Sequence, residues 1–153
     1  MTAAYTYRLA RDDDQARLFR LYRSVMKSHI ELIWGWDEQW QEHDFSEHFE
    51  PNWITVVLSR NEPVGYAQVE PRSNVLYLRM FLLDPEHQNK GVGTGVLKRI
   101  ISAASEEHLG VMLQVFKINK PARRFYEHRG FRVVGETSTS LVMELDASRA
   151  SRS

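Results

Sequence analysis

The stretch that decides the fold runs from residue 76 to residue 95 and reads LYLRMFLLDPEHQNKGVGTG. Its first half is apolar and typical of a β-strand. Asp84-Pro85 ends this strand, because proline has no N–H for a sheet ladder and restricts the residue before it. The glycine-rich segment that follows leads into a helical pattern. Since glycine lets the backbone approach an anion closely, and free N–H groups point outward at a helix start, this order predicts a phosphate-binding loop.

Two well-known phosphate-binding motifs fit the segment poorly. A Walker loop has Gly-Lys followed by Ser or Thr, whereas the order here is Lys90-Gly91. A dinucleotide-binding fingerprint has its third glycine three residues after the second, but Gly95 comes only two residues after Gly93. The fingerprint also needs an acidic residue at the end of the next strand, which is expected near Phe116 and has none. Nucleotide hydrolysis is therefore disfavoured.

The segment instead resembles the acetyl-CoA loop of the GCN5-related N-acetyltransferase (GNAT) superfamily. That loop follows a strand and a proline and has the pattern Gln/Arg-x-x-Gly-x-Gly/Ala, which Gln88, Gly91 and Gly93 match. A second stretch is similar to a later signature of the same superfamily, a strand followed by Asn-x-x-Ala-x-x-x-Tyr-x-x-x-Gly-Phe. Its matching residues are Asn119, Ala122, Tyr126, Gly130 and Phe131. The two motifs together cover roughly residues 75 to 135, and the first half of the chain agrees only in the order of its elements.

The resemblance implies an α/β (α+β) fold with a mixed, mostly antiparallel sheet and helices on both faces. A central parallel pair of strands would splay apart at the cofactor site. One N-acetyltransferase domain would span residues 1–146, and residues 147–153 are expected to be a flexible tail. The implied reaction moves an acetyl group from acetyl-CoA to a primary amine, of a small molecule or a peptide, by direct attack.

The resemblance also assigns roles to individual residues. Backbone N–H groups of Phe81, Leu82 and Leu83 would face the acetyl carbonyl and the pantetheine arm. The pyrophosphate would lie on backbone N–H groups of the loop, contributed by Gln88, Asn89, Lys90, Gly91, Val92, Gly93 and Thr94. Asn119 would contact the pantetheine region, and Tyr126 would act as the general acid that protonates the departing thiolate.

The general base is not determined by the motifs. Relatives that acetylate ribosomal-protein N-termini carry a glutamate five residues before the motif asparagine, and Gln114 occupies that position here. An amide cannot accept the proton of the attacking amine. Glu70, Glu31, Glu38 or a chain of water molecules remain as candidates, and the sequence does not choose among them.

Residues 29–50 combine three tryptophans, Trp34, Trp36 and Trp40, with many acidic side chains. One interpretation is a wall of the acceptor pocket that attracts a cationic amine through aromatic faces and carboxylates. The other is an amphipathic helix that Asp37 caps and that turns Trp40, Phe45 and Phe49 inward. His29, His43 and His48 lack the i, i+4 spacing of helical metal ligands, so we expect no metal.

Composition limits the partners and the cellular location that we expect for this protein. The 153 residues suffice for one domain, and 20 basic side chains balance 20 acidic ones, so neither nucleic acid nor an anionic membrane is an expected partner. The chain has no cysteine, no apolar run long enough to span a membrane, and no signal-peptide order at its N-terminus, so we expect a cytoplasmic location. A homodimer is possible. A non-catalytic acyl-CoA-binding sensor or partner module, and a transferase of a bulkier acyl group, remain alternatives.

Periodicity predicts the order of the other elements. Strands are expected near residues 5–9, 53–58, 64–69, 111–116, 131–134 and 141–145, in addition to the opening strand. Core-facing helices are expected over residues 18–26, 96–104 and after Asn119, with Gly110 as a left-handed cap. The helix between the opening strand and the strand at 111–116 predicts a right-handed crossover and parallel pairing.

Overall fold

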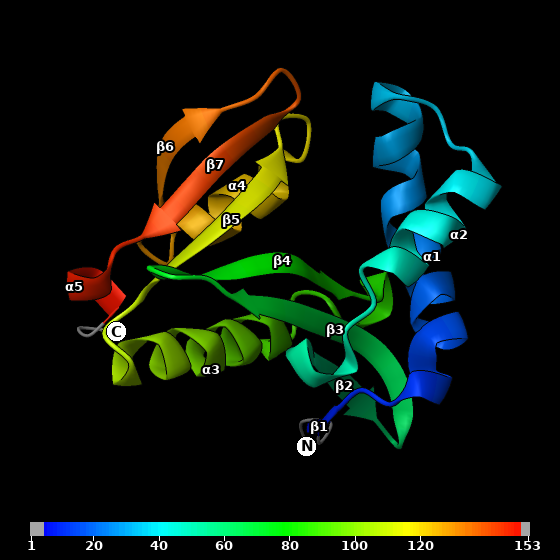
Figure 1. Ribbon diagram of the computed structural model, residues 1–153, viewed down its shortest axis with the longest axis horizontal. Helices are drawn as coiled ribbons and strands as arrows, with labels where there is room; N and C mark the ends of the chain where they lie inside the picture. Colours follow the sequence, from blue (N-terminus) through cyan, green and yellow to red (C-terminus); the bar gives the residue numbers. More distant parts are fainter. Residues whose placement is uncertain (1–4, 151–153) are drawn as a thin grey trace. The chain divides into compact units, whose positions relative to one another are not determined.

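The computed structural model describes residues 5–150 of the chain and contains seven strands in one sheet. The strands are β1 (Tyr5–Leu9), β2 (Ile54–Ser59), β3 (Glu62–Pro71), β4 (Val75–Leu83), β5 (Gly110–Phe116), β6 (Arg132–Glu136) and β7 (Ser140–Leu145). The helices are α1 (Gln15–Ile33), α2 (Glu38–Glu47), α3 (Val92–Glu106), α4 (Lys120–Glu127) and the short α5 (Ala147–Ala150) (Figure 1). The strand order is β1-β2-β3-β4-β5-β7-β6, and the one parallel pair is β4 with β5. The predicted mixed, mostly antiparallel α/β fold is confirmed.

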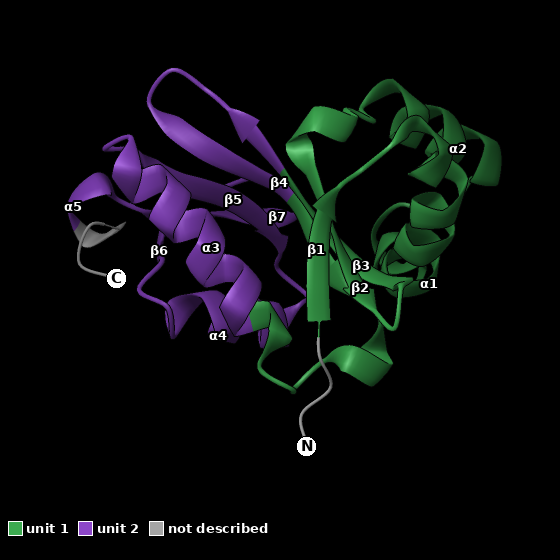
Figure 2. Cartoon of the chain, turned by 90° about the horizontal axis from the view of Figure 1, so that it is seen from below, with its two compact units in different colours: residues 1–68, 80–93 green, residues 69–79, 94–153 purple. Residues whose placement is uncertain are grey.

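The chain divides into two compact units, which Figure 2 shows in different colours. Unit 1 comprises residues up to 68 together with residues 80–93. Unit 2 comprises residues 69–79 and the residues from 94 onward. The boundary runs through β3, β4 and α3, so each of these elements contributes residues to both units.

In unit 1, β1 pairs antiparallel with β2, and β2 pairs antiparallel with β3. The turn between β2 and β3 consists of Arg60 and Asn61, whose φ angles of 53° and 64° are both positive. Two residues with positive φ form the tight turn that matches the twist of paired strands. The hairpin predicted at this position is therefore confirmed.

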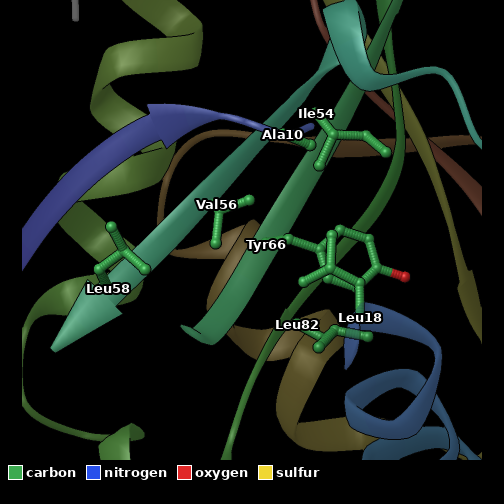
Figure 3. Packing of buried hydrophobic residues seen from close by; sticks show 7 residues of the cluster. All are labelled: Ala10, Leu18, Ile54, Val56, Leu58, Tyr66 and Leu82. Atoms are coloured by element: carbon green, nitrogen blue, oxygen red, sulfur yellow. The ribbon is translucent and has the colours of Figure 1, made fainter. Parts of the chain in front are cut away.

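A cluster of buried apolar residues forms the core of unit 1 (Figure 3). Its members are Ala10, Leu18, Ile54, Val56, Leu58, Tyr66 and Leu82. The other residues of the predicted α1 stripe, from Leu21 to Met26, pack against this cluster, as do Phe45 and Phe49. The burial of one helix face against a sheet face is the main stabilising contribution to such a unit.

The structure corrects the prediction for Trp40, which is 59% exposed and does not face the core. The physical reason is the start of α2. The Asp37 carboxylate accepts the Trp40 N–H at 3.0 Å and fixes the first turn. With that start, the inward positions fall on Gln41, which is buried, and on Phe45 four residues later. Trp40 is one position away from this face.

In unit 2, the parallel register joins Val75–Leu78 of β4 to Gly110–Leu113 of β5. The predicted parallel pairing is confirmed, and the splay implied for the later residues of these strands stays a prediction. Strand β7 pairs antiparallel with both β5 and β6. The predicted core residues of α3, from Val96 to Ala104 at helical spacing, are buried.

The end of α3 differs from the prediction. The left-handed residue is His108, with φ of 59°, and Gly110 is instead the first residue of β5. A Cβ at Gly110 would lie 2.7 Å from the carbonyl oxygen of Leu145, so glycine is needed there for close packing of backbones. Residues 147–150 form α5, and the rest of the predicted tail, residues 151–153, lies outside the described residues.

Candidate functional site

The end of β4 is held by contacts within unit 1. The side chains of Leu82 and Leu83 are buried, and the Asp84 N–H donates to the carbonyl oxygen of Val64 at 2.7 Å. The side-chain amide of Gln88 folds back and donates to the carbonyl oxygen of Leu83 at 2.9 Å. Gln88, the first residue of the acetyl-CoA loop motif, therefore links the loop to the end of the preceding strand by a hydrogen bond. Phe81, Leu82 and Leu83 are thus fixed on the segment that leads directly into the predicted phosphate loop.

The predicted loop contains a short 3-10 turn and two residues in the left-handed conformation. Asp84 accepts the Glu86 N–H at 3.1 Å and starts a short 3-10 turn over Pro85–His87. Asn89 and Gly91 then adopt positive φ angles of 61° and 81°. Left-handed residues reverse the direction of neighbouring N–H groups and create anion-binding concavities. α3 starts at Val92, directly after this turn.

The first turn of α3 contains Gly93 and Thr94. The first four N–H groups of a helix have no intrahelical acceptor and carry the positive end of the helix dipole. The Thr94 hydroxyl oxygen accepts a hydrogen bond from the Arg129 guanidinium at 2.7 Å. This contact joins residues 35 positions apart, so the motifs did not reveal it. Within unit 2, the Thr94 side chain therefore lies beside a cation.

Asn119 is the N-cap of α4, as predicted. Its side-chain oxygen accepts the Ala122 N–H at 3.2 Å, and Pro121 follows in the first turn of the helix. The capping bond occupies one lone pair of the amide oxygen and leaves the amide N–H₂ group as a donor. The structure thus shows the structural role of Asn119, and its pantetheine contact stays a prediction.

Tyr126 is buried on α4, where its ring packs edge-to-face against Phe125 and Phe131, with centroids 5.3 Å and 5.6 Å away. Burial raises the pKa of the Tyr126 phenol well above its usual range. The phenol is therefore protonated at neutral pH and available as a hydrogen donor. The aromatic surroundings fix the direction in which the ring points.

Each candidate base is engaged with a cation. Glu70 accepts hydrogen bonds from Arg72 at 3.2 Å and from Arg79 at 3.3 Å. Glu31 is exposed and lies 3.7 Å from the Lys27 ammonium. Both carboxylates therefore already have cationic partners.

The Glu38 carboxylate has two hydrogen-bond donors, Trp36 and Arg23. The Trp36 indole N–H donates to its carboxylate at 2.8 Å, and Arg23 pairs with it as well. The hydrogen bond from Trp36, together with that from Arg23, lowers the pKa of Glu38. A carboxylate with a lowered pKa is a weaker base, so these surroundings disfavour Glu38 as the proton acceptor.

The tryptophans of the predicted acceptor wall lie at the end of α1 and the start of α2. Trp34 is 63% exposed and Trp40 is 59% exposed, whereas Trp36 is partly buried with its ring centroid 6.2 Å from that of Tyr22. The side chains of Trp34 and Trp40 are therefore largely exposed to solvent. Among the described residues, no group of three or more potential ligands could hold a metal ion.

Within each unit, the structure brings part of the predicted site together. Unit 1 contains Phe81, Leu82, Leu83 and the loop from Gln88 to Gly93 on one continuous segment. Unit 2 contains Thr94, Asn119 and Tyr126. Sequence reasoning missed Arg129, and it missed the hydrogen bond of 2.9 Å between the Tyr5 hydroxyl and His87 Nδ1 in the loop. Both contacts join distant segments and have no local sequence signal. No helix among residues 5–150 is long and apolar enough to cross a membrane.

The sequence is similar to that of known acetyltransferases. Residues 14–131 match the model of the acetyltransferase (GNAT) family. Streptothricin acetyltransferase A of Bacillus subtilis is 32% identical over 98 residues, which cover 63% of this chain and 51% of that protein. The 5-NmdU N-acetyltransferase of Pseudomonas phage PaMx11 is 29% identical over 91 residues, covering 58% of this chain and 64% of that protein. The chain thus matches less than two thirds of the length of either relative.

A solved structure with a similar fold is that of the PaiA N-acetyltransferase from Thermoplasma acidophilum in complex with coenzyme A. Its TM-score is 0.78 at 18% sequence identity, and the match covers 94% of this chain and 99% of that one. Because the family model matches most of the chain, the protein belongs to the acetyltransferase (GNAT) family.

Proposed function

We propose that the protein is an acetyl-CoA-dependent N-acetyltransferase that acts on a primary amine. The observation that carries this proposal is the loop of residues 84–94, in which the left-handed residues Asn89 and Gly91 lead directly into α3. The family match and the coenzyme A in the similar PaiA structure support the same donor. The named relatives act on different acceptors, so the family alone does not select one.

Acetyl-CoA fits the chemistry of this segment. Its diphosphate is an anion for the N–H groups of residues 88–94, with a favourable contribution from the α3 dipole. Its thioester carbonyl would accept hydrogen bonds from the backbone of Phe81, Leu82 or Leu83. Such donors stabilise the oxyanion of a tetrahedral intermediate, which is commonly the largest contribution in acyl transfer.

The proposed reaction is direct acetyl transfer. The neutral amine nitrogen attacks the thioester carbon, and the C–N bond forms as the carbonyl oxygen becomes an oxyanion. Collapse of this intermediate breaks the C–S bond and releases coenzyme A as a thiolate. The nitrogen loses a proton to a base, and the thiolate gains one from the Tyr126 hydroxyl. The products are an acetamide and coenzyme A.

The buried Tyr126 is suited to hold a proton but is a weak acid. Burial raises its pKa because the phenolate is poorly solvated. The same desolvation raises the pKa of a thiol bound in an apolar surrounding, which offsets the lower acidity of the buried phenol. This match supports the role of general acid.

For the base, we propose that water relays the proton from the amine to Glu31 or Glu70. The donor bonds that lower the pKa of Glu38 make it the least suitable of the three carboxylates. For the acceptor, the exposed Trp34 and Trp40 and the surrounding acidic residues support a cationic amine.

A non-catalytic acyl-CoA-binding module is the second candidate, because each carboxylate named above is already paired with a cation. Calorimetry with coenzyme A and acetyl-CoA tests donor binding first, and no heat at millimolar ligand would exclude both candidates. A thiol-release assay over a panel of amines, including polyamines, neutral amines and peptide N-termini, then separates them. Turnover on any acceptor supports the enzyme, and binding without turnover on all of them supports the sensor.

A further inference from the structure

We propose that Arg129 is a side-chain ligand of the coenzyme A diphosphate, an assignment that rests on the proposed donor. The observation behind it is the hydrogen bond of 2.7 Å from the Arg129 guanidinium to the hydroxyl oxygen of Thr94. Thr94 is the third residue of α3, in the turn whose backbone N–H groups would receive the diphosphate. The contact therefore places a permanent positive charge beside that turn.

The position of Arg129 follows from how α4 ends. The Arg129 N–H donates to the carbonyl oxygen of Tyr126 at 3.0 Å, and Gly130 reverses the chain with a φ of 94°. The guanidinium carbon also lies 5.7 Å from the Phe125 ring centroid, within the range of a cation–π contact. Backbone, hydroxyl and ring thus restrict the side chain before any ligand binds. A preorganised cation loses less conformational entropy on binding.

The charge of Arg129 is available for an anion. Over the described part of the chain, no carboxylate lies within ion-pair distance of its guanidinium, whereas Arg123, on the preceding helix α4, pairs with Glu127 at 3.5 Å. A guanidinium has several N–H donors in a planar fork, and the Thr94 contact uses only one of its two terminal nitrogens. The remaining donors match the spacing of phosphate oxygens, which favours a bidentate contact.

The test is calorimetric titration of the purified full chain with coenzyme A and with dephospho-coenzyme A, which keeps the diphosphate and lacks the 3′-phosphate. We expect Arg129→Gln to weaken binding of both ligands by the same factor, about ten-fold. Arg129→Lys keeps a charge but loses the fork, so we expect a smaller loss of about three-fold. The matched control is Arg123→Gln, which removes an exposed and already paired arginine of the preceding helix α4 and should leave both affinities unchanged.

The results separate the possible outcomes. Unchanged affinity of Arg129→Gln, with the wild-type protein binding coenzyme A, would overturn the assignment and leave the proposed function intact. A loss seen with coenzyme A but not with dephospho-coenzyme A would move Arg129 to the 3′-phosphate and contradict a diphosphate contact. If Arg123→Gln and Arg129→Gln weaken binding equally, the loss of affinity reflects general surface charge, and the assignment of Arg129 as a diphosphate ligand is wrong. No binding by the wild-type protein would instead contradict the proposed function. Thermal melting of each variant checks that it is folded.

Discussion

Gly65 lies against the carbonyl oxygen of Leu82, so closely that a Cβ at residue 65 would be 2.5 Å from that oxygen. The same Cβ would be 2.5 Å from Leu83 Cδ2 and 3.2 Å from Leu83 Cα. Gly65 is a buried residue of β3, and Leu82 and Leu83 form the end of β4. The absence of a side chain on β3 therefore sets the position of the backbone that is proposed to bind the thioester.

The substitution Gly65→Ala should accordingly be costly. Because backbone atoms must move, we expect the free energy of unfolding to fall by about 2–3 kcal/mol, and kcat/KM for acetyl-CoA to fall as the end of β4 shifts. Gly135→Ala is the matched control, since a Cβ there meets only Val142 Cβ at 3.9 Å. Urea unfolding and initial rates measure both effects, and equal stability of the two variants would contradict the packing argument.

A substitution at Gly91 should act differently, because this glycine is needed for its positive φ angle and not for lack of space around a side chain. Its φ is +81°, and nothing lies within 4 Å of the Cβ position. Gly91→Ala should lower stability by about 1–2 kcal/mol and weaken coenzyme A binding as the loop relaxes. Gly35 has a φ of +84° and equal free space in a different loop. Gly35→Ala should thus show the same loss of stability in thermal melts with unchanged coenzyme A affinity, and a loss of affinity there would argue against a local role of Gly91.

Tyr126→Phe removes the hydroxyl and keeps the buried ring with its contacts to Phe125 and Phe131. If the hydroxyl is the general acid, kcat should fall by about ten- to a thousand-fold with little change in coenzyme A affinity. Because burial raises the pKa of Tyr126, the phenol stays protonated through the alkaline range, and its ionisation should produce no loss of kcat below pH 10. The control is Tyr77→Phe, at a half-buried phenol stacked under Arg72. Equal loss of binding and turnover in Tyr126→Phe would make Tyr126 a purely structural residue.

The Asp14 carboxylate is expected to stabilise the fold at neutral pH and to lose this effect in acid. Its buried carboxylate accepts two hydrogen bonds from the Arg8 guanidinium, at 2.7 Å and 2.9 Å, and one from the Arg11 N–H at 2.7 Å. The hydrogen bond from Arg8 lowers the pKa of Asp14 below its ordinary 3.8. Because the pKa of Asp14 is lower in the folded protein than in the unfolded chain, its ionised form stabilises the fold. This stabilisation is fully present at a pH above the unfolded-state pKa and is lost as the pH falls through the folded-state pKa.

We therefore expect Asp14→Asn to lower the free energy of unfolding by about 2 kcal/mol at neutral pH, because the Arg8 charge is left without its partner. The difference from the wild-type protein should shrink as the pH falls below 3.8, which urea unfolding at several pH values measures. Glu62→Gln, which breaks the exposed ion pair with Arg17, should change stability by less than about 1 kcal/mol at every pH. A pH-independent effect of Asp14→Asn would show that its charge is not involved.

The sequence by itself determined the features that depend on near neighbours along the chain. Asp84-Pro85 ended β4, Asn119 capped α4 three residues before Ala122, and the apolar spacing in α3 placed Val96 and Leu97 in the core. Caps, turns and helix faces are set by residues within about four positions, so a local pattern is enough to predict them. The same holds for the predicted phosphate loop, where the motif glycine at residue 91 has a left-handed conformation.

Only the tertiary structure decided which distant residues meet. Arg129 donates a hydrogen bond to Thr94 across 35 positions, and Tyr5 and His87 share one across 82. Gly65 packs against Leu82 on another strand. The exposure of Trp40 and the left-handed conformation of His108 also depart from what local spacing predicts. Such contacts depend on the packing of whole elements, and the energy of any one pair is too small to leave a pattern in the surrounding sequence.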